Sequence, residues 1–327
     1  MHTPSEQLRW NLLILKDEFY IMSAMSAEMI GKIDHIVFHP VKGAGALETP
    51  RTRLTKEGIE GDRQFMIVRA VADKHGVFHF ITQRDKRDKS DKLQGLAVMS
   101  QIKPQFARDT LLLTWQGREP IEVPQDMNVG REMQVQIWDD VVSAVDQGDR
   151  LAEWLSDHLK LDTRLVKAAG SFHRPARQNY VENDSTVRFQ DGYPVHWFFQ
   201  ESVDELSQIA GEPIPWQSFR PNLVASGSPA QTEHALYTGE VAGVPFINPK
   251  PCDRCPVTNV DQETGEVKNG RALTHLAKYK RWRKNTGEQV VIFGENMLPL
   301  GEGEIQVGDE IVLTERRNPP LGYGAKV

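Results

Sequence analysis

The residues most able to do chemistry lie between Asn248 and Asp261, where Cys252 and Cys255 stand three positions apart in a proline-rich loop. Two thiols at this spacing can bind a soft metal, cycle as a dithiol or supply one nucleophile. Arg254 is adjacent to Cys255 and is expected to favour its thiolate, the form that ligates metals. No second cysteine pair or histidine pair nearby completes a zinc site, and the context lacks the strand–helix pattern of thioredoxin-like proteins. From the spacing alone, the two cysteines could still be half of a zinc site or a redox pair.

Cationic residues beside turn-forming residues make up a second set of candidates. Lys42 follows the first expected strand, Arg63 precedes another, and Arg220 and Asn222 flank a proline. Taken singly, a Lys or Arg is more often a solvated surface charge, and Arg63 beside Asp62 is equally compatible with a structural ion pair. Their occurrence together with the cysteine loop is what indicates a binding site.

Composition narrows the class of protein. The chain has 327 residues, 39% of them hydrophobic and 26% charged, as in globular proteins. A net charge of −6 provides no global basic field for nucleic acid, so an anionic ligand must be bound by a local cluster of cations. Two cysteines are too few for a disulfide scaffold or for an iron–sulfur cluster held by thiolates alone. We therefore expect a reducing, cytoplasmic location, and no apolar run approaches the roughly 20 residues of a membrane span.

Elements that must position these residues are mostly strands. Short segments rich in β-branched or aromatic residues and bounded by turns predict strands at 32–38, 64–68, 78–82, 110–115, 133–137, 164–166, 223–225, 240–242, 290–293 and 310–313. Helices are expected at 149–160, after a capping box formed by Ser202 and Glu205, and at 273–282. The predicted fold class is mostly β with a few helices (α+β), arranged as two β-barrel-like domains.

The polar stretch 171–184 is the best candidate for a domain boundary. We expect an N-terminal extension at 1–28, a first β-barrel domain at 29–168, a second domain at 169–317 and a tail at 318–327.

Six short motifs occur in an order that resembles one known family. They are PVKG at 40–43, GDRQF at 61–65, FRPN at 219–222, PCDRC at 251–255, TNVD at 258–261 and VGDEI at 307–311. The chain resembles proteins in which a MOSC N-terminal β-barrel domain precedes a MOSC domain, over about residues 30–315. The family includes mitochondrial amidoxime-reducing components and bacterial MOSC reductases that detoxify N-hydroxylated bases. No single motif is specific, but the ordered set is.

The resemblance implies a molybdenum cofactor, in which a pterin dithiolene holds the metal. Cys255 would be the metal ligand and the catalytic residue, which suits a sulfur-rich centre. Guanidinium groups bind a phosphate dianion bidentately, and an amide such as that of Asn222 can both donate and accept at the pterin edge. The implied cofactor-binding residues are Lys42, Gly43, Arg63, Asp191, Arg220, Asn222, Asp253 and Arg254.

Two positions depart from the family pattern. Gly43 stands where relatives often have Ser, so one hydroxyl group for the phosphate is missing. The family's Asp-Thr-Ser-Pro-like stretch reads Asp191-Gly192-Tyr193-Pro194 here, so Asp191 keeps its place while both hydroxyl contacts are in doubt.

The implied function is molybdenum-dependent reduction of N-hydroxylated compounds, namely hydroxylamines, amidoximes and N-hydroxylated bases, to amines or amidines. We expect an external electron-transfer protein, such as a ferredoxin, a cytochrome or a flavin reductase, since no Gly-x-Gly-x-x-Gly follows a strand. Two alternatives remain: a sulfur carrier with a persulfide on Cys255, and a cofactor carrier without turnover.

Overall fold

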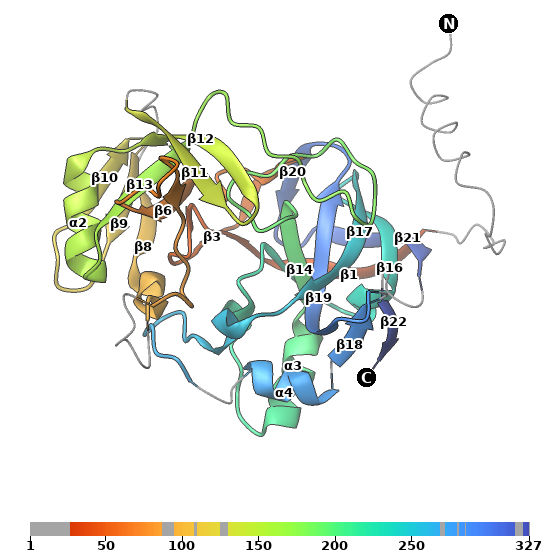
Figure 1. The fold of residues 1–327 in the computed structure, drawn as a ribbon. Helices are drawn as coiled ribbons and strands as arrows, with labels where there is room; N and C mark the ends of the chain where they lie inside the picture. Colours follow the sequence, from red (N-terminus) through yellow and green to blue (C-terminus); the bar gives the residue numbers. More distant parts are fainter. Residues whose placement is uncertain are drawn as a thin grey trace, which may run out of the picture.

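The computed structural model describes residues 27–86, 95–107, 110–124, 130–268, 272–279, 281–284, 286–317 and 323–326. The expected N-terminal extension, apart from its last two residues, lies outside the described residues, as does most of the expected tail. Figure 1 shows a β-sheet part flanked by one helix beside a barrel with two helices below it. The described residues are mostly in strands, with three α-helices, so the predicted fold class is confirmed.

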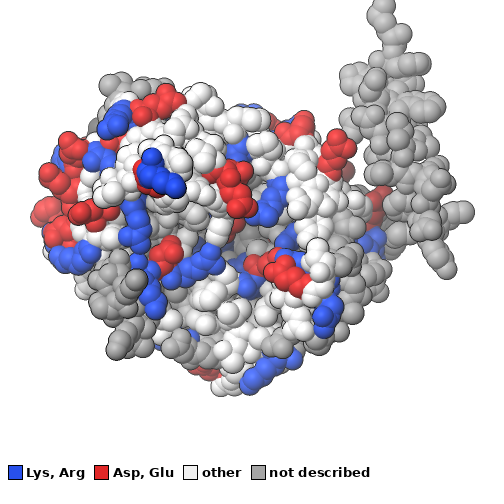
Figure 2. All heavy atoms as spheres, in the orientation of Figure 1, with Lys and Arg blue, Asp and Glu red and all other residues white. Residues whose placement is uncertain are grey.

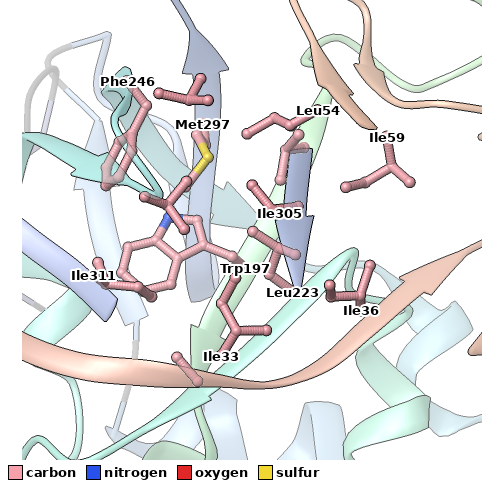
Figure 3. Close-up of a cluster of buried hydrophobic side chains, with 14 of the residues drawn as sticks. Ile33, Ile36, Leu54, Ile59, Trp197, Leu223, Phe246, Met297, Ile305 and Ile311 are labelled. Carbon is pink, nitrogen blue, oxygen red and sulfur yellow. The ribbon is translucent and has the colours of Figure 1, made fainter. Parts of the chain in front are cut away.

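Seven strands close into a barrel. Their order is β14 (Val195–Phe199), β15 (Leu223–Ser226), β1 (Glu28–Phe38), β21 (Glu310–Arg316), β16 (Leu236–Val241), β17 (Val244–Asp253) and β19 (Gln289–Pro299), and β19 pairs back with β14. Closure leaves none of these seven strands with a free edge. Alternate side chains fill the interior, where Trp197 lies in one apolar cluster with Phe246, Ile33 and Met297 (Figure 3).

Strand β1, at the start of the described chain, pairs with strands from the C-terminal half of the chain. It pairs antiparallel with β15 and with β21, and β3 (Leu47–Thr49) pairs with it in turn. A small sheet of β20 (Gly303–Gln306), β4 (Arg51–Thr55) and β5 (Gly58–Ile59) joins the same two regions. The two parts of the molecule are therefore interwoven in sequence, and the boundary at 171–184 stays a prediction.

The second part is a six-stranded sheet beside a three-stranded one. The first has the order β2 (Val41–Lys42), β6 (Phe65–Arg69), β13 (Thr163–Ala168), β12 (Asp140–Asp146), β11 (Glu132–Ile137) and β7 (Phe78–His79). The second has the order β10 (Ile121–Pro124), β9 (Thr110–Thr114) and β8 (Lys103–Ala107), preceded by the 3-10 helix η1 (Ala97–Gln101). Helix α2 (Asp149–Leu159) buries Leu151, Leu155 and Leu159 against them, as its sequence period predicts.

Two other predicted helices differ in detail. Helix α3 (Gln200–Ala210) begins before Ser202, whose hydroxyl donates to the buried Glu233 carboxylate at 2.8 Å instead of capping the helix. The segment expected to be helical at 273–282 divides into α4 (Ala272–Tyr279) and β18 (Arg281–Lys284), because Trp282 pairs with Val290 of β19. β18 also pairs with β22 (Tyr323–Lys326).

Three short 3-10 helices complete the description: η2 (Trp216–Phe219), η3 (Thr232–Ala235) and η4 (Pro256–Asn259). A search of the described residues finds no helix with the length and apolar character needed to span a membrane.

Candidate functional site

A cavity of about 170 Å³ lies where the N-terminal sheet meets the barrel, and all of the predicted cofactor-binding and metal-ligating residues line it. Figure 2 shows Lys and Arg side chains, with some acidic ones among them, around a hollow near the middle of this face. The predicted residues brought together there are Lys42, Gly43, Arg63, Asp191, Arg220, Asn222, Asp253, Arg254 and Cys255. Their co-location is a structural fact, and their individual roles stay predictions.

Lys42 enters the cavity from β2 and is almost fully buried, with 8% of its surface exposed. Its Nζ donates to the Phe189 carbonyl at 2.8 Å and to Asp191 Oδ1 at 2.5 Å. Burial lowers the pKa of Lys42, although Asp191 opposes this effect. Desolvation where Asp191 meets Lys42 disfavours the charged carboxyl, but the Lys42 ammonium outweighs this effect and holds the pKa of Asp191 well below its usual range, although most of the Asp191 side chain is exposed. The two groups therefore form an ion pair at neutral pH.

Arg63 is the second predicted phosphate-binding cation, and it too already has a carboxylate partner. Its Nη1 reaches both oxygens of Asp62, at 2.6 and 2.7 Å, and its Nη2 donates to the Arg220 carbonyl at 3.3 Å. The Asp62 side chain has no exposed surface and also accepts the His39 backbone N–H at 2.8 Å. The structural ion pair weighed from the sequence is thus present, and it faces the cavity.

Arg220 is held differently. It follows η2 with a φ of +51°, a left-handed conformation that turns its side chain toward the cavity. Its guanidinium donates through Nη1 to Gln262 Oε1 at 2.8 Å and forms no salt bridge with any described residue. Burial, and then the nearby Arg63, lowers the pKa of Arg220 to about 9. A partly buried cation without a carboxylate partner is costly, so this group is suited to receive an anion.

Asn222 lines the cavity and is 2% exposed. Its Oδ1 accepts the His196 backbone N–H at 3.1 Å, and its Nδ2 donates to the Val37 carbonyl at 3.2 Å. The amide therefore ties three barrel strands together. One N–H and one lone pair remain for a ligand, fewer than the sequence alone suggests.

The Arg254 guanidinium contacts Cys252, and not its neighbour Cys255. Nη1 donates to Cys252 Sγ at 2.9 Å, and Nη2 to the Phe219 carbonyl at 2.8 Å. Side chains two positions apart in an extended chain lie on the same side, and β17 extends through Asp253. The expectation that Arg254 acts on Cys255 because it is adjacent was therefore wrong about its contact. Burial raises the pKa of the Cys252 thiol despite Arg254, so Cys252 stays protonated at neutral pH.

Cys255 occupies the N-cap position of η4, after β17 has ended. Its carbonyl accepts the Thr258 backbone N–H at 3.1 Å and the Thr258 hydroxyl at 3.0 Å, which fixes the loop that presents the thiol to the cavity. Asp253, between the two cysteines in sequence, is held by Lys250 and Lys284, each with Nζ 2.9 Å from its Oδ2.

Gly43 fits its place for a steric reason. Its φ is +84°, which favours glycine, and a Cβ there would lie 2.7 Å from Met99 Cε. The Ser that the family often has at this position would need Met99 to move. Gly43 also offers its carbonyl to Gln83 Nε2 at 2.7 Å.

Several polar residues in and beside the cavity escaped the sequence analysis, among them two histidines and two glutamines. His39 and His196 are buried beside the arginines, and Gln83 and Gln262 meet between the two halves of the molecule. Burial, reinforced by Arg63 for one and by Arg254 for the other, holds the pKa of His39 and of His196 well below the usual range. His39 stands directly before the PVKG motif and Gln262 directly after TNVD, so adjacency to a motif was the available signal.

The cavity suits an anionic group that carries a metal. Five cations line it (Lys42, Arg63, Arg84, Arg220 and Arg254). Asp191 and Asp62 neutralise Lys42 and Arg63, and Arg84 is exposed and lies over the Trp138 ring, 5.1 Å from its centroid. The two partly buried charges that remain, on Arg220 and Arg254, match one phosphate dianion. Among the described residues, no group of three His, Cys, Asp or Glu side chains could hold a metal ion. The described residues therefore do not support the interpretation of the cysteine pair as half of a zinc site. A single protein thiol suits a metal whose other ligands belong to a cofactor.

Comparison with known proteins identifies the family. Residues 30–162 match the MOSC N-terminal beta barrel domain, and residues 184–312 match the MOSC domain. The chain belongs to the family of proteins that join these two domains, as the ordered motifs predicted.

Two kinds of curated relative are similar to it. The chain is 23% identical over 300 residues to mitochondrial amidoxime reducing component 2 from Rattus norvegicus, covering 87% of this chain and 83% of that protein. It is 24% identical over 254 residues to molybdenum cofactor sulfurase from Bos taurus, covering 72% of this chain but 27% of that protein. Among solved structures, the YUAD protein from Bacillus subtilis is similar at a TM-score of 0.39 and 10% identity, over 89% of this chain and 99% of that one. That likeness is too distant to support a conclusion.

Proposed function

We propose that this protein is a molybdenum-cofactor-dependent oxidoreductase that reduces N-hydroxylated compounds to amines or amidines. The observation that carries the proposal is a cavity that combines a single presented thiol, Cys255, with a partly buried cation, Arg220, that has no carboxylate partner among the described residues. A relative that covers most of the chain is named an amidoxime reducing component, which supports the reaction class.

Each side of the cavity would have its own part in holding the cofactor. Arg220, together with Lys42 and Arg63, would bind the phosphate, and the Cys255 thiolate would be the protein's ligand to the metal. Asn222 and Asp253 would contact the pterin from the barrel side, while Gly43 would bring the backbone of its turn against the phosphate. The bound cofactor would supply the two-electron redox centre that the chain's own residues lack.

The overall conversion of R–NH–OH into R–NH₂ and water takes two electrons and two protons. We also propose the cytoplasmic location that the cysteine content suggests. An external electron-transfer protein would deliver the electrons. Purified protein with NADH or NADPH alone should not sustain turnover. Sustained reduction without any added redox protein or dye would contradict the requirement for a partner.

The test combines metal analysis with an assay. Protein produced in a host that makes the cofactor should contain stoichiometric molybdenum and should reduce benzamidoxime with a chemically reduced dye. Protein from a host unable to make the pterin should do neither. Bound zinc in place of molybdenum, or molybdenum without any turnover, would refute the reductase assignment.

A second candidate is a sulfur carrier with a persulfide on Cys255. It is favoured by the similarity to proteins named molybdenum cofactor sulfurases. The chain spans 27% of the length of the bovine one. Mass spectrometry after incubation with a cysteine desulfurase and cysteine separates the two. The carrier predicts an added sulfur atom on Cys255, and a cofactor carrier without turnover predicts neither sulfur nor reduction.

A further inference from the structure

Two buried side-chain amides join the halves of the molecule beside the cavity. Gln83, from the N-terminal part, and Gln262, from the loop after the cysteines, pair reciprocally: each Nε2 donates to the other's Oε1 at 3.0 Å. Gln83 Nε2 also donates to the Gly43 carbonyl at 2.7 Å, and Gln262 Nε2 to the Val260 carbonyl at 3.3 Å. Gln262 Oε1 accepts in addition from Arg220 Nη1 at 2.8 Å. All four N–H bonds of the two amides are therefore used.

This chain of hydrogen bonds has a single consistent orientation. At one end the Gly43 carbonyl can only accept, and at the other end the Arg220 guanidinium can only donate. Turning the Gln262 amide over would bring its NH₂ group against the Arg220 N–H, and turning Gln83 over would bring its oxygen against the Gly43 carbonyl. The Arg220 donor and the Gly43 acceptor together fix which way both amides face. With that orientation fixed, Gln262 Oε1 is the acceptor that holds the Arg220 guanidinium in place.

We propose that Gln83 and Gln262 are positioning residues, which hold the Arg220 guanidinium in register with the Lys42–Gly43 turn so that both face one anionic group of the phosphate type. The inference deepens the proposed function and rests on it in one respect, namely that this anion is the cofactor's phosphate. Arg220 has no other side-chain hydrogen bond to a described residue, so Gln262 is what sets its direction. The Lys42–Gly43 turn is in the other half of the molecule, and Gln83 is its link to Gln262.

The backbone of the loop has anchors of its own, which makes the inference testable. Lys103 Nζ donates to the Gln262 backbone carbonyl at 3.0 Å, and Gln101 Nε2 donates to the Thr264 carbonyl at 2.7 Å. Because these contacts do not involve the Gln262 side chain, the loop should keep its place when that side chain is changed. Gln101 also supplies a matched control, since it contacts the same loop from the same half but does not contact Arg220.

The experiment measures the affinity of inorganic phosphate for the full chain, produced in a host without molybdopterin, by titration calorimetry at low salt. Gln262→Met removes the acceptor for Arg220 and should weaken binding about tenfold, the usual scale for one hydrogen bond to a charged group. Gln262→Glu keeps the acceptor and the size but neutralises Arg220, so it should weaken binding further. Gln83→Met should cause a smaller loss, and Gln101→Met should leave the affinity unchanged.

The order of these effects decides the inference. A purely structural role predicts that affinity follows the melting temperature, so that Gln262→Glu, if as stable as the unaltered protein, binds phosphate equally well. That result, equal losses in Gln101→Met and Gln262→Met, or no phosphate binding by the unaltered chain would overturn the proposal. If Gln262→Met does not fold, Gln83→Met against Gln101→Met makes the same comparison.

Molybdenum content of the same variants, produced in a cofactor-competent host, separates this inference from the proposed function. If the unaltered protein contains no molybdenum while the Gln262 variants still lose phosphate affinity, the proposed function fails and the positioning role stands. If the unaltered protein contains molybdenum and the variants bind phosphate normally, the positioning role fails alone.

Discussion

The two sides of the cavity differ in how their positive charges are compensated. On the N-terminal side, the buried Lys42 is paired with Asp191 and the partly buried Arg63 with Asp62, while the exposed Arg84 lies over the Trp138 ring. On the barrel side, Arg220 and Arg254 form no salt bridge with a described residue and instead contact an amide, a thiol and a backbone carbonyl. The paired side resembles an ordinary structural network, whereas the barrel side needs an external anion. Sequence motifs mark both sides equally and do not reveal this difference.

The largest effect should come from the two thiols of the barrel side. Cys255→Ser should abolish molybdenum-dependent activity, because the proposed metal ligand is lost. Cys252→Ser should leave a measurable fraction, since the Cys252 sulfur contacts Arg254 and its pKa is raised by burial. Benzamidoxime reduction by each variant, together with its molybdenum content, measures the difference. Equal losses in both, accompanied by zinc, would restore the zinc interpretation.

The arginines offer a direct test of the comparison. Arg220→Ala should lower affinity for the pterin phosphate about a hundredfold, since a charge-assisted contact contributes about 2–3 kcal/mol, while the protein stays folded. Arg63→Ala should also lose the cofactor, but it leaves the fully buried Asp62 without its cation, at a cost of about 3 kcal/mol in stability. Urea unfolding and metal analysis of the two variants distinguish these outcomes. Equal stability in both would mean that the two sides do not differ as described.

Most of the residues that line the site could be predicted, because they stand in short motifs in a recognisable order. The side chains to which they hydrogen-bond could not be predicted. The order of the motifs resembles one family, which predicted that Lys42, Arg220 and Cys255 bind the same cofactor, and the structure brings the three residues to one cavity. From the sequence, Arg254 was expected to act on the adjacent Cys255. In the structure it contacts Cys252, because side chains two positions apart in an extended chain lie on the same side. Gln83 and Gln262, 179 positions apart, had no sequence signal that could pair them.

The fold shows the same limit. Short segments rich in β-branched or aromatic residues predicted strands, and apolar residues three and four positions apart predicted the buried face of α2, since local sequence determines both. Which strands close the barrel depends on long-range pairing, so the placement of β1 between β15 and β21 could not be read from the sequence. The helix expected at 273–282 ends early, at Tyr279, for the same reason, because pairing with β19 outweighs the helical spacing at Trp282.

Acid should destabilise the protein through the two buried histidines beside the arginines. The pKa of His39 and of His196 is lowered in the folded state, by burial first and then by Arg63 and Arg254 respectively. The unfolded chain therefore binds more protons as the pH falls below about 6.5, and each histidine can cost up to about 1.4 kcal/mol per pH unit. Urea unfolding between pH 7.5 and 5.5 measures the slope. His39→Gln should flatten it, and the exposed His173→Gln should not; an unchanged slope in His39→Gln would contradict this cause.

The smallest expected effect tests the N-terminal side itself. Asp191 is 75% exposed, yet it holds the Lys42 ammonium at 2.5 Å, so a phosphate that approaches Lys42 must compete with this carboxylate. Asp191→Asn keeps the shape, removes the competing charge and should tighten the binding of inorganic phosphate by about threefold, on the scale of an ion pair with one exposed partner. Asp184→Asn, which removes the exposed carboxylate partner of Lys56 away from the cavity, is the matched control and should not change the affinity. Calorimetry on cofactor-free protein makes the measurement, since a pterin would add contacts of its own to Asp191. Weaker phosphate binding in Asp191→Asn would show that Asp191 orients Lys42 for the anion instead of competing with it, and the distinction between a compensated and an uncompensated side would then no longer hold.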